Sequence, residues 1–443
     1  MQRFLLEQSG DFYTSHSGLA LVGLCLDKYT DMTKQLSREV GVVVSGASHF
    51  DVLKSYIGLL SIGKSDYDAI RNHRDDTYFK KSLGIKRIPS PEILRQRLDK
   101  HAEPFRRVVE RCSVELLRNA NVPVSAVSSG HVPVDIDVFP MDNSDTKKEG
   151  VSRTYHNTDG YAPIAAYLGQ EGWCLEIELR PGSQHSQKGF IAFLERVLHK
   201  ARMVTGGNRK LLVRLDSAHD AVETRATLRK QEGISYILKW NPRKEDTAAL
   251  AARAFSKGRV STPRDGKRVA LLTTWQEQEH DGQTYRFTKV LRATERTIDK
   301  KGQRLLVPEL VVEGWWSNLV MPPEHIIRLY EDHGLSEQFH SEFKTDLDLE
   351  RLPSGKFATN ALVMALAVMA YNILRYIGQL GLLGEVAPVR HPAKRRRIRT
   401  VIQELIYMAG RLVSSGRRWK LRFGRHCPGY QAFALVYNRL ALA

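Results

Sequence analysis

The chain has 443 residues, of which 42% are hydrophobic, so it is long enough for two or three domains with buried cores. Its 67 Lys and Arg residues outnumber its 49 Asp and Glu residues, and the net charge of +18 predicts a polyanionic partner, either nucleic acid or an anionic membrane. Residues 1–10 are too few and too mixed for a signal peptide, and the longest apolar run, 361–370, covers about half of a membrane and predicts a buried helix. We therefore expect nucleic acid as the partner and no membrane association.

The four cysteines are scattered and form no Cys-x-x-Cys pair: Cys25, Cys112, Cys174 and Cys427. This pattern is typical of thiols that pack in the core of a protein in a reducing compartment. It predicts neither disulfides nor a zinc site, and it favours a cytoplasmic protein.

Residues 1–125 are expected to be helical. Amphipathic patterns predict helices at residues 17–40, 49–62, 67–83, 93–101 and 105–119. Ser90 followed by Pro91 is an N-cap with proline at the first helical position, which marks the start of the fourth helix. A basic, helix-rich N-terminal region is typical of a domain that binds DNA ends, and we assign residues 1–125 as a helical DNA-binding domain. A helix bundle with a purely structural role fits the pattern equally well.

From residue 126 the pattern changes to strands that alternate with helices. Strands are predicted at 131–139, 160–168, 173–179, 211–216 and 234–240, and helices at 186–204 and 221–231. Three strands, a helix, a strand, a helix and a strand are the element order of an RNase H-like domain. We therefore expect an α/β fold of this class, with its first part at 126–240 and its second part at 321–384. Such mixed sheets place functional acids at strand ends.

Three acids in these strands are candidate metal ligands. Asp135 and Asp137 lie two residues apart in the first strand and project from the same face, and Asp216 ends the strand 211–216. A buried acid without a partner costs stability, whereas carboxylate oxygens are the ligands that Mg²⁺ prefers. The acids therefore predict a metal site. For each acid taken alone, the alternative is a strand-end cap or a turn residue.

Residues 241–320 predict a β-rich insertion in the α/β domain. A helix is expected at 246–255 and strands at 269–279, 283–293 and 305–312, with Asp281-Gly282 as a hairpin turn. Trp315 and Trp316 lie near its end. They are candidates for stacking on an unpaired base, although core packing is the interpretation that we favour.

The segment 322–350 begins with two prolines and predicts a helix. At about 100° per residue, four polar side chains share one stripe of this helix: Tyr330, His333, Glu337 and Lys344. A lone carboxylate among donors and cations is a candidate third ligand for a divalent metal that works on phosphate. The alternatives are a solvated helix face and a zinc face of His333, Glu337 and His340, which no HExxH motif supports.

Residues 385–443 contain 13 Lys and Arg residues against two acids, which is +11 of the total charge of +18. Five of the cations follow Pro392 as one cluster: Lys394, Arg395, Arg396, Arg397 and Arg399. An amphipathic helix is expected at 400–413. We predict a basic helical tail that contacts the phosphate backbone of DNA, the alternative being a solvated run of charges.

The stripe of Tyr330, His333, Glu337 and Lys344 resembles the Y-R-E-K signature of bacterial insertion-sequence transposases of the DDE type. VDIDVF, which contains Asp137, is similar to the strand of that family that carries its first catalytic Asp. VRLDSAHD, which contains Asp216, is similar to the VRxDSGF motif around the second, with His219, which we expect to pack, where Phe is usual. His333 stands where the family has Arg, and a neutral imidazole is a weaker phosphate ligand than a guanidinium.

The resemblance implies a transposase with three catalytic acids, Asp137, Asp216 and Glu337, and with Asp135 as the reserve candidate for the first. In that family the acids hold two Mg²⁺ ions, for which we expect Mn²⁺ to substitute. The reaction is cleavage at the ends of the element and transfer of the 3′-OH into target DNA. Tyr330, His333 and Lys344 would contact phosphates at the element's end.

The implied partners are double-stranded DNA, as terminal inverted repeats and as target, and a second copy of the chain in a homodimer on DNA. No nucleotide cofactor is expected, and the protein would associate with the bacterial nucleoid. Two other functions remain open. One is a transposase-derived DNA-binding regulator that no longer cuts, and the other is a nuclease that hydrolyses DNA without strand transfer.

Overall fold

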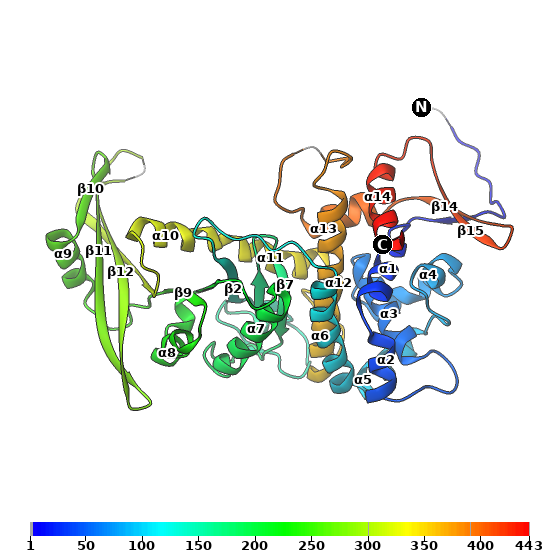
Figure 1. Ribbon diagram of the computed structural model, residues 1–443, viewed down its shortest axis with the longest axis horizontal. Coiled ribbons are helices and arrows are strands. Elements are labelled where there is room, and N and C mark those ends of the chain that lie inside the picture. The colour runs from blue at the N-terminus through cyan, green and yellow to red at the C-terminus, as the bar shows by residue number, and fades with distance from the viewer. Residues whose placement is uncertain (1–2, 300, 390, 443) are drawn as a thin grey trace.

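The computed structural model describes residues 3–299, 301–389 and 391–442, and within these ranges the side chains of residues 333, 335 and 336 are not described. The molecule is elongated (Figure 1). A β-rich arm forms one end, a mixed sheet lies in the middle, and the N-terminal helices lie with the C-terminal region at the other end.

The N-terminal region is helical, as predicted. Local signals set two helix starts: Ser48 and Asp51 form a reciprocal capping box, and the Ser90 hydroxyl accepts a hydrogen bond from the Ile93 amide. The stretch 17–40, predicted as one helix, is two helices because the backbone is extended at Thr30. The helices are α1 (Leu19–Tyr29), α2 (Met32–Glu39), α3 (His49–Ser61), α4 (Thr77–Ser82), α5 (Pro91–Lys100) and α6 (Ala102–Asn119), with a 3-10 helix at Tyr67–His73.

The middle of the molecule is a mixed sheet with the strand order β7-β6-β2-β8-β9. β2 pairs antiparallel with β6, and β6 antiparallel with β7, whereas β2, β8 and β9 are parallel neighbours. The predicted strands are confirmed, except that 160–168 is divided before β6 at Pro163, which has no N–H to donate to a ladder. The elements are β2 (Val132–Val138), β6 (Ile164–Leu168), β7 (Trp173–Glu178), α7 (Phe190–Thr205), β8 (Leu211–Leu215), α8 (Val222–Lys230) and β9 (Ile234–Lys239).

A small sheet of short strands lies beside the main one. It is formed by β3 (Met141–Asp142), β5 (Asp159–Tyr161) and β4 (Ser152–Arg153), in that spatial order. The loop between β4 and β5 carries Tyr155 towards the carboxyl end of β2, where the Tyr155 hydroxyl donates a hydrogen bond of 3.1 Å to the Val138 carbonyl.

The predicted β-rich insertion is present and extends the central sheet instead of forming a separate one. β13 pairs with β9, so nine strands form one continuous sheet. Asp281 and Gly282 have positive φ and make the predicted hairpin turn. An edge strand, β10, was not predicted because its side chains are uniformly exposed. The elements are α9 (Thr247–Lys257), β10 (Arg259–Arg264), β11 (Lys267–His280), β12 (Gln283–Ile298) and β13 (Arg304–Ser317).

The segment 322–350 is helical but is not one α-helix, so the prediction of a continuous helix was wrong. Its elements are α10 (Pro323–Glu331), a 3-10 helix at Asp332–Leu335, α11 (Ser336–Ser341) and a π-helix at Glu342–Asp346. Gly334 lies in the 3-10 stretch, where glycine weakens α-helix formation. A rotation of about 100° per residue, as in a regular α-helix, therefore does not describe how Tyr330 and Lys344 lie relative to each other.

The central helix of the fold is α12 (Phe357–Gly381), which packs against α6, α3 and β7. It contains the apolar run 361–370, which was predicted to be a buried helix, and this prediction is confirmed. By length and composition α12 could cross a membrane, but 83% of its most apolar stretch is buried inside the fold. It joins the N-terminal helices and the central sheet in one hydrophobic core.

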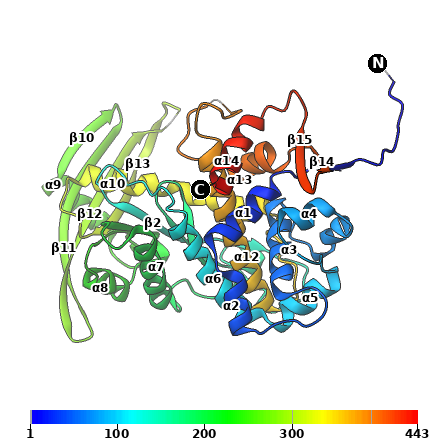
Figure 2. The same ribbon diagram turned by 45° about the vertical axis from the view of Figure 1, so that its right-hand side comes forward.

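The C-terminal region is only partly helical: the helix predicted at 400–413 ends at residue 406, and the prediction of an all-helical tail was wrong because strands follow. α13 (Ile398–Val401) and a π-helix at Ile402–Ile406 are followed by a hairpin of β14 (Gly410–Ser415) and β15 (Arg418–Phe423), and then by α14 (Tyr430–Leu442). Gly416 and Arg417 have positive φ and form the two-residue turn. β14 also pairs with β1 (Phe12–Thr14), from the other end of the chain. Figure 2 shows the hairpin at the same end of the molecule as α1 and α4.

Candidate active site

A pocket of about 370 Å³ lies between the central sheet, the β-rich arm and the segment after α10. Its lining includes Asp137, Asp216 and Glu337, the three acids assigned as catalytic from the sequence, together with Tyr330. They come from three separate parts of the chain: β2, the end of β8, and the adjacent helices α10 and α11. His333 was predicted to lie on one helix face with Tyr330, Glu337 and Lys344. Its side chain is outside the described part of the structure.

Strand register places the two aspartates side by side. In the parallel pairing of β2, β8 and β9, Ile136 is opposite Leu215, and Leu215 is opposite Leu238. The residues that come directly after these three are Asp137, Asp216 and Lys239. Two carboxylates and an ammonium group therefore lie at matching positions at the carboxyl ends of three adjacent parallel strands. Functional groups gather at this edge of such sheets.

At this edge Asp137 contacts the backbone and lies near a histidine. The Val138 amide donates a hydrogen bond of 2.8 Å to Asp137 Oδ1. Nδ1 of His340 lies 3.9 Å from Asp137 Oδ2, and the His340 ring stacks on Phe139. His340 is therefore held beside the first acid by packing.

Glu337 is exposed in α11, and the residues around it are anchored. Gln338 accepts a hydrogen bond of 2.7 Å from Arg395 Nη2, and the Arg395 guanidinium lies 4.4 Å above the Phe339 ring. Five residues beyond Glu337, Glu342 is buried and forms an ion pair with Arg375 of α12. Glu342 therefore serves the core, whereas Glu337 faces the pocket.

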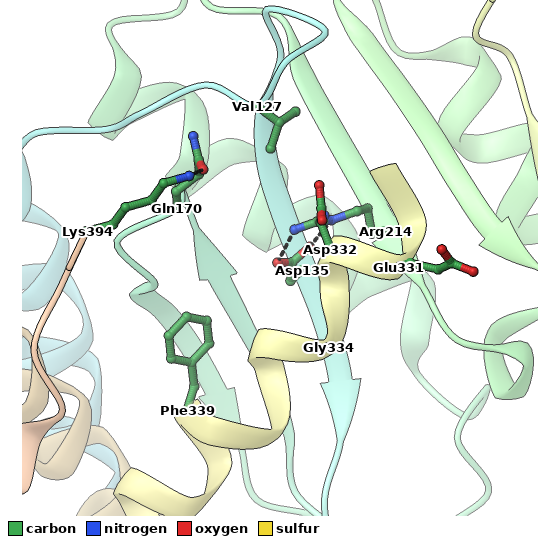
Figure 3. Close-up of a pocket in the computed structure, with 10 residues that line it drawn as sticks. Val127, Asp135, Gln170, Arg214, Glu331, Asp332, Gly334, Phe339 and Lys394 are labelled. Atoms are coloured by element: carbon green, nitrogen blue, oxygen red, sulfur yellow. Dashed lines mark hydrogen bonds and ion pairs between the residues drawn. The ribbon is translucent and has the colours of Figure 1, made fainter. Parts of the chain in front are cut away.

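Asp135, the reserve candidate for the first catalytic acid, forms an ion pair with Arg214. Arg214 donates from Nε to Asp135 Oδ1 at 2.6 Å and from Nη2 to Oδ2 at 2.7 Å, and both side chains are buried. Arg214 Nη1 also donates to the Leu329 carbonyl of α10 at 2.7 Å. Figure 3 shows this pair in a neighbouring pocket of about 350 Å³, beside Glu331, Asp332 and Gly334. Asp135 thus links two strands and the helix that leads to Glu337.

The negative charges of Asp137 and Asp216 help to raise the pKa values of two nearby tyrosines. Burial, followed by the charges of Asp137 and Asp216, raises the pKa of Tyr155 to about 12. Burial and the same two charges also raise the pKa of Tyr330. Both hydroxyls stay protonated at neutral pH, and that of Tyr155 donates its hydrogen bond to the Val138 carbonyl. Tyr155 was not predicted, since nothing in its local sequence distinguishes it.

The opposite side of the pocket carries a charged network that the sequence did not predict. Lys239 Nζ is 2.7 Å from Glu313 Oε1, and Arg292 Nη2 is 2.6 Å from Glu313 Oε2. Burial disfavours the Glu313 carboxylate, but the hydrogen bonds from Lys239 and Arg292 prevail and lower its pKa. The sequence signal for Lys239 was its place at the end of a predicted strand, as for Asp216.

Three predictions of packing are confirmed. Trp315 and Trp316 are buried, and Lys239 Nζ lies 4.3 Å above the Trp315 ring, so these indoles belong to the core. His219 is buried and stacks on Phe190 with ring centroids 4.0 Å apart. Burial and the nearby charges of Arg180 and His185 lower the pKa of His219 to about 3, so its ring is neutral at neutral pH.

The predicted DNA contacts divide into two groups. Lys344 Nζ donates to the Pro140 carbonyl at 3.0 Å and lies 3.0 Å from Glu350 Oε2, so it braces the loop after β2. Arg395, Arg396 and Arg397 also bond within the protein, Arg397 through Nε and Nη2 to Asp346. Lys394 and Arg399 are exposed, although Lys394 Nζ also donates a hydrogen bond to Gln170 Oε1. Among the basic cluster, those two are the residues with the side chains most open to solvent.

No metal cluster is assembled within the described part of the chain. There, no group of three or more His, Cys, Asp or Glu side chains is placed to hold a metal ion. The zinc face of His333, Glu337 and His340 is not tested by this, because the His333 side chain is not described. The three acids share a pocket but do not yet form a closed set of ligands.

Comparison with known proteins identifies the family. No curated protein matches the chain. A cryo-EM structure of a piggyBac transposase synaptic complex with hairpin DNA is similar at 11% sequence identity, over 89% of this chain and 80% of that chain, with a TM-score of 0.39. The family described as transposase DDE domain group 1 matches residues 2–443. The match spans nearly the whole chain, and the protein belongs to this family of DDE transposases.

Proposed function

We propose that this protein is the transposase of an insertion sequence, which cleaves DNA at the ends of the element and joins the freed 3′-OH to target DNA. One observation carries the proposal: Asp137 and Asp216 follow the same row at the ends of adjacent parallel strands, and Glu337 lines the same pocket. Membership of a DDE transposase family supports a DNA-acting enzyme. The strand order β7-β6-β2-β8-β9 supports an RNase H-like catalytic domain.

The donor chemistry of the pocket suits Mg²⁺. Carboxylate oxygens are the hard ligands that Mg²⁺ and Mn²⁺ take, and Mg²⁺ keeps several waters, so few protein ligands are needed for each of two ions. The present spacing falls short of a closed ligand set. Glu337 lies in a six-residue helix that follows a 3-10 stretch, and it lines the same pocket as the two aspartates.

Asp137, Asp216 and Glu337 would hold the ions. When bound, Mg²⁺ neutralises charge on phosphate oxygens and lowers the pKa of bound water. Tyr330, whose raised pKa keeps the phenol protonated, would donate a hydrogen bond to a phosphate oxygen of the element's end. Lys239, at the carboxyl end of β9, would place a positive charge at the same edge of the sheet as Asp137 and Asp216.

Duplex DNA would be held outside the pocket by exposed cations. Lys394 and Arg399 are the members of the basic cluster best placed for this, and His333 is proposed as a weaker contact than the usual arginine. Two ends must be paired during transposition, so we propose a homodimer on DNA.

A second candidate is a transposase-derived regulator that binds DNA without cutting. His333, which stands where the family has Arg, favours it, whereas the presence of all three acids argues against it. Calorimetric titration with Mg²⁺ separates the two functions, because a site that no longer cuts has no need to bind metal in pairs.

The deciding experiment incubates the protein with Mg²⁺ and a labelled duplex that bears the element's end, with wild type beside Asp137→Ala and Glu337→Gln. We expect cleavage by wild type alone and near-normal binding by all three. Equal cleavage by Asp137→Ala would refute its role and transfer it to Asp135. Tight binding without cleavage by wild type would support the regulator. Failure of a pre-cut 3′-OH end to join target DNA, with cleavage intact, would indicate a nuclease.

A further inference from the structure

A groove of about 590 Å³ lies far from the candidate active site, between the β14–β15 hairpin, α14 and the α1–α4 region. Its volume is within the range of sites that hold small organic ligands. Six of its thirteen lining residues are aromatic: Tyr78, Trp419, Phe423, Tyr430, Phe433 and Tyr437. This concentration of rings in a basic protein suggests a ligand that is both flat and anionic.

The rings form a continuous row. Phe423 lies 5.5 Å from Tyr430 and 5.0 Å from Phe433, and Phe433 stacks on Tyr437 at 6.1 Å, measured between ring centroids. Phe433 is buried and anchors the row, whereas Tyr430 and Tyr437 are 50% and 40% exposed. The row therefore has a fixed base and open ring faces.

Trp419 and Tyr430 are equally exposed, and Trp419 is the ring that a cation contacts. It is 50% exposed, and Lys81 Nζ of α4 lies 4.3 Å from its ring centroid. A cation held against an indole offers a flat surface and a positive charge at one place. Nucleobases stack on such rings, and the phosphate of the same nucleotide is attracted by the ammonium.

The hairpin places cations next to the rings. Along β15, Trp419, Leu421 and Phe423 line the groove, and they alternate with Arg418, Lys420 and Arg422, which are exposed. Successive strand residues point to opposite faces, so the face of β15 towards the groove is apolar, with two aromatic rings, and the other face is basic. β15 is an edge strand, and Arg417 lies in its turn. A flexible chain that runs along this edge therefore meets rings on one side and cations on the other.

We propose that this groove binds an unpaired nucleotide of single-stranded DNA, with its base stacked on Trp419 and its flanking phosphates against the cations of β15. Duplex DNA does not fit this role, because paired bases are stacked on one another and cannot reach the rings. A second copy of the chain is disfavoured, since a two-fold interface would bring the same cations together. This site goes beyond the proposed cleavage and strand-transfer pocket and does not depend on its acids.

The test measures binding by fluorescence anisotropy in EDTA, so that no metal-dependent cleavage takes place. The probes are a labelled oligo-dT of about 12 nucleotides and a duplex of the same length. Trp419→Ala removes the ring, and Trp419→Phe keeps a stacking surface. Trp275→Ala is the matched control, because Trp275 is 53% exposed with the Arg286 guanidinium 3.9 Å above its ring, in the β-rich arm.

We expect Trp419→Ala to weaken binding of oligo-dT at least about fivefold, as loss of one stacked base does, and to change duplex binding less than about twofold. Trp419→Phe and Trp275→Ala should bind oligo-dT within about twofold of wild type. Thermal unfolding checks that Trp419→Ala is folded.

Three results would overturn the proposal. The first is unchanged oligo-dT binding by folded Trp419→Ala. The second is an equal loss on duplex and single strand, which would indicate backbone contact alone. The third is a fall in the molecular mass of Trp419→Ala in solution, which would assign the groove to a second copy of the chain. None of these results bears on metal-dependent cleavage, so the two proposals fail separately.

Discussion

Asp135 and Arg214 lie opposite each other on adjacent parallel strands and form a bidentate ion pair, 2.6 Å from Nε to Oδ1 and 2.7 Å from Nη2 to Oδ2. The same guanidinium holds the Leu329 carbonyl. The pair therefore fixes β2, β8 and α10 together, next to the strand ends that carry Asp137 and Asp216. We infer that Asp135 is a structural residue and that Asp137 is the metal ligand.

The first prediction separates these two aspartates. Asp135→Asn should destabilise the fold by about 3–5 kcal/mol, because it leaves the Arg214 charge buried without its partner. Asp137→Asn should change the free energy of unfolding little and abolish cleavage. Chemical denaturation and the cleavage assay measure the two effects. The double variant Asp135→Leu with Arg214→Met should recover part of the lost stability, and failure to do so would argue against the ion pair as the cause.

The second prediction compares two glutamates five residues apart. Glu342 is buried against Arg375, whereas Glu337 is exposed at the pocket. Glu342→Gln should cost about 3–5 kcal/mol in unfolding free energy, because the Arg375 charge stays buried. Glu337→Gln should leave stability unchanged and remove Mg²⁺-dependent cleavage. Normal cleavage by Glu337→Gln would contradict its assignment, whatever the behaviour of Glu342.

The third prediction divides the basic cluster. Arg397 bonds Asp346, so Arg397→Gln should destabilise the protein by about 1–3 kcal/mol. Lys394→Gln with Arg399→Gln should change stability by less than about 0.5 kcal/mol. This double variant should instead weaken duplex binding and reduce the slope of log affinity against log salt by about 0.9 for each phosphate that the protein no longer neutralises. An unchanged slope would show that the two exposed cations do not touch DNA.

The fourth prediction concerns acid stability. His49 packs against His101 and Phe105 at the start of α3, with ring centroids 4.8 Å and 5.2 Å away. Burial, followed by the positive charges of His101, Arg97 and Lys100, lowers the pKa of His49 to about 4 from its ordinary value of 6.5. Between these values the unfolded chain binds more protons at this residue than the folded chain.

The stability that neutral His49 contributes is therefore fully present above pH 6.5 and is lost as the pH falls towards 4. His49→Gln should flatten the decline of unfolding free energy over this interval, measured by urea denaturation at a series of pH values. His426→Gln is the control, since His426 is exposed near the other end of the chain. The same decline in wild type and His49→Gln would show that other groups cause the loss.

The sequence by itself determined the order of strands and helices in residues 126–240 and the acids at the strand ends. Both are local properties: the strand pattern has a period of two residues, and Asp137 and Asp216 directly follow apolar residues of their strands. It also determined the excess of positive charge. Those features need no knowledge of which strand lies beside which.

Only the tertiary structure decided what each charged group does. Asp135 and Asp137 look alike in sequence, and the neighbour strand supplies Arg214 to one of them. Lys239 joins the row of Asp137 and Asp216 through strand register, which no local pattern encodes. The hairpin of the tail is joined to β1, from the opposite end of the chain, through the pairing of β1 with β14. Backbone pairing and ion pairs between distant residues depend on how the chain packs, so they form only when the fold is complete.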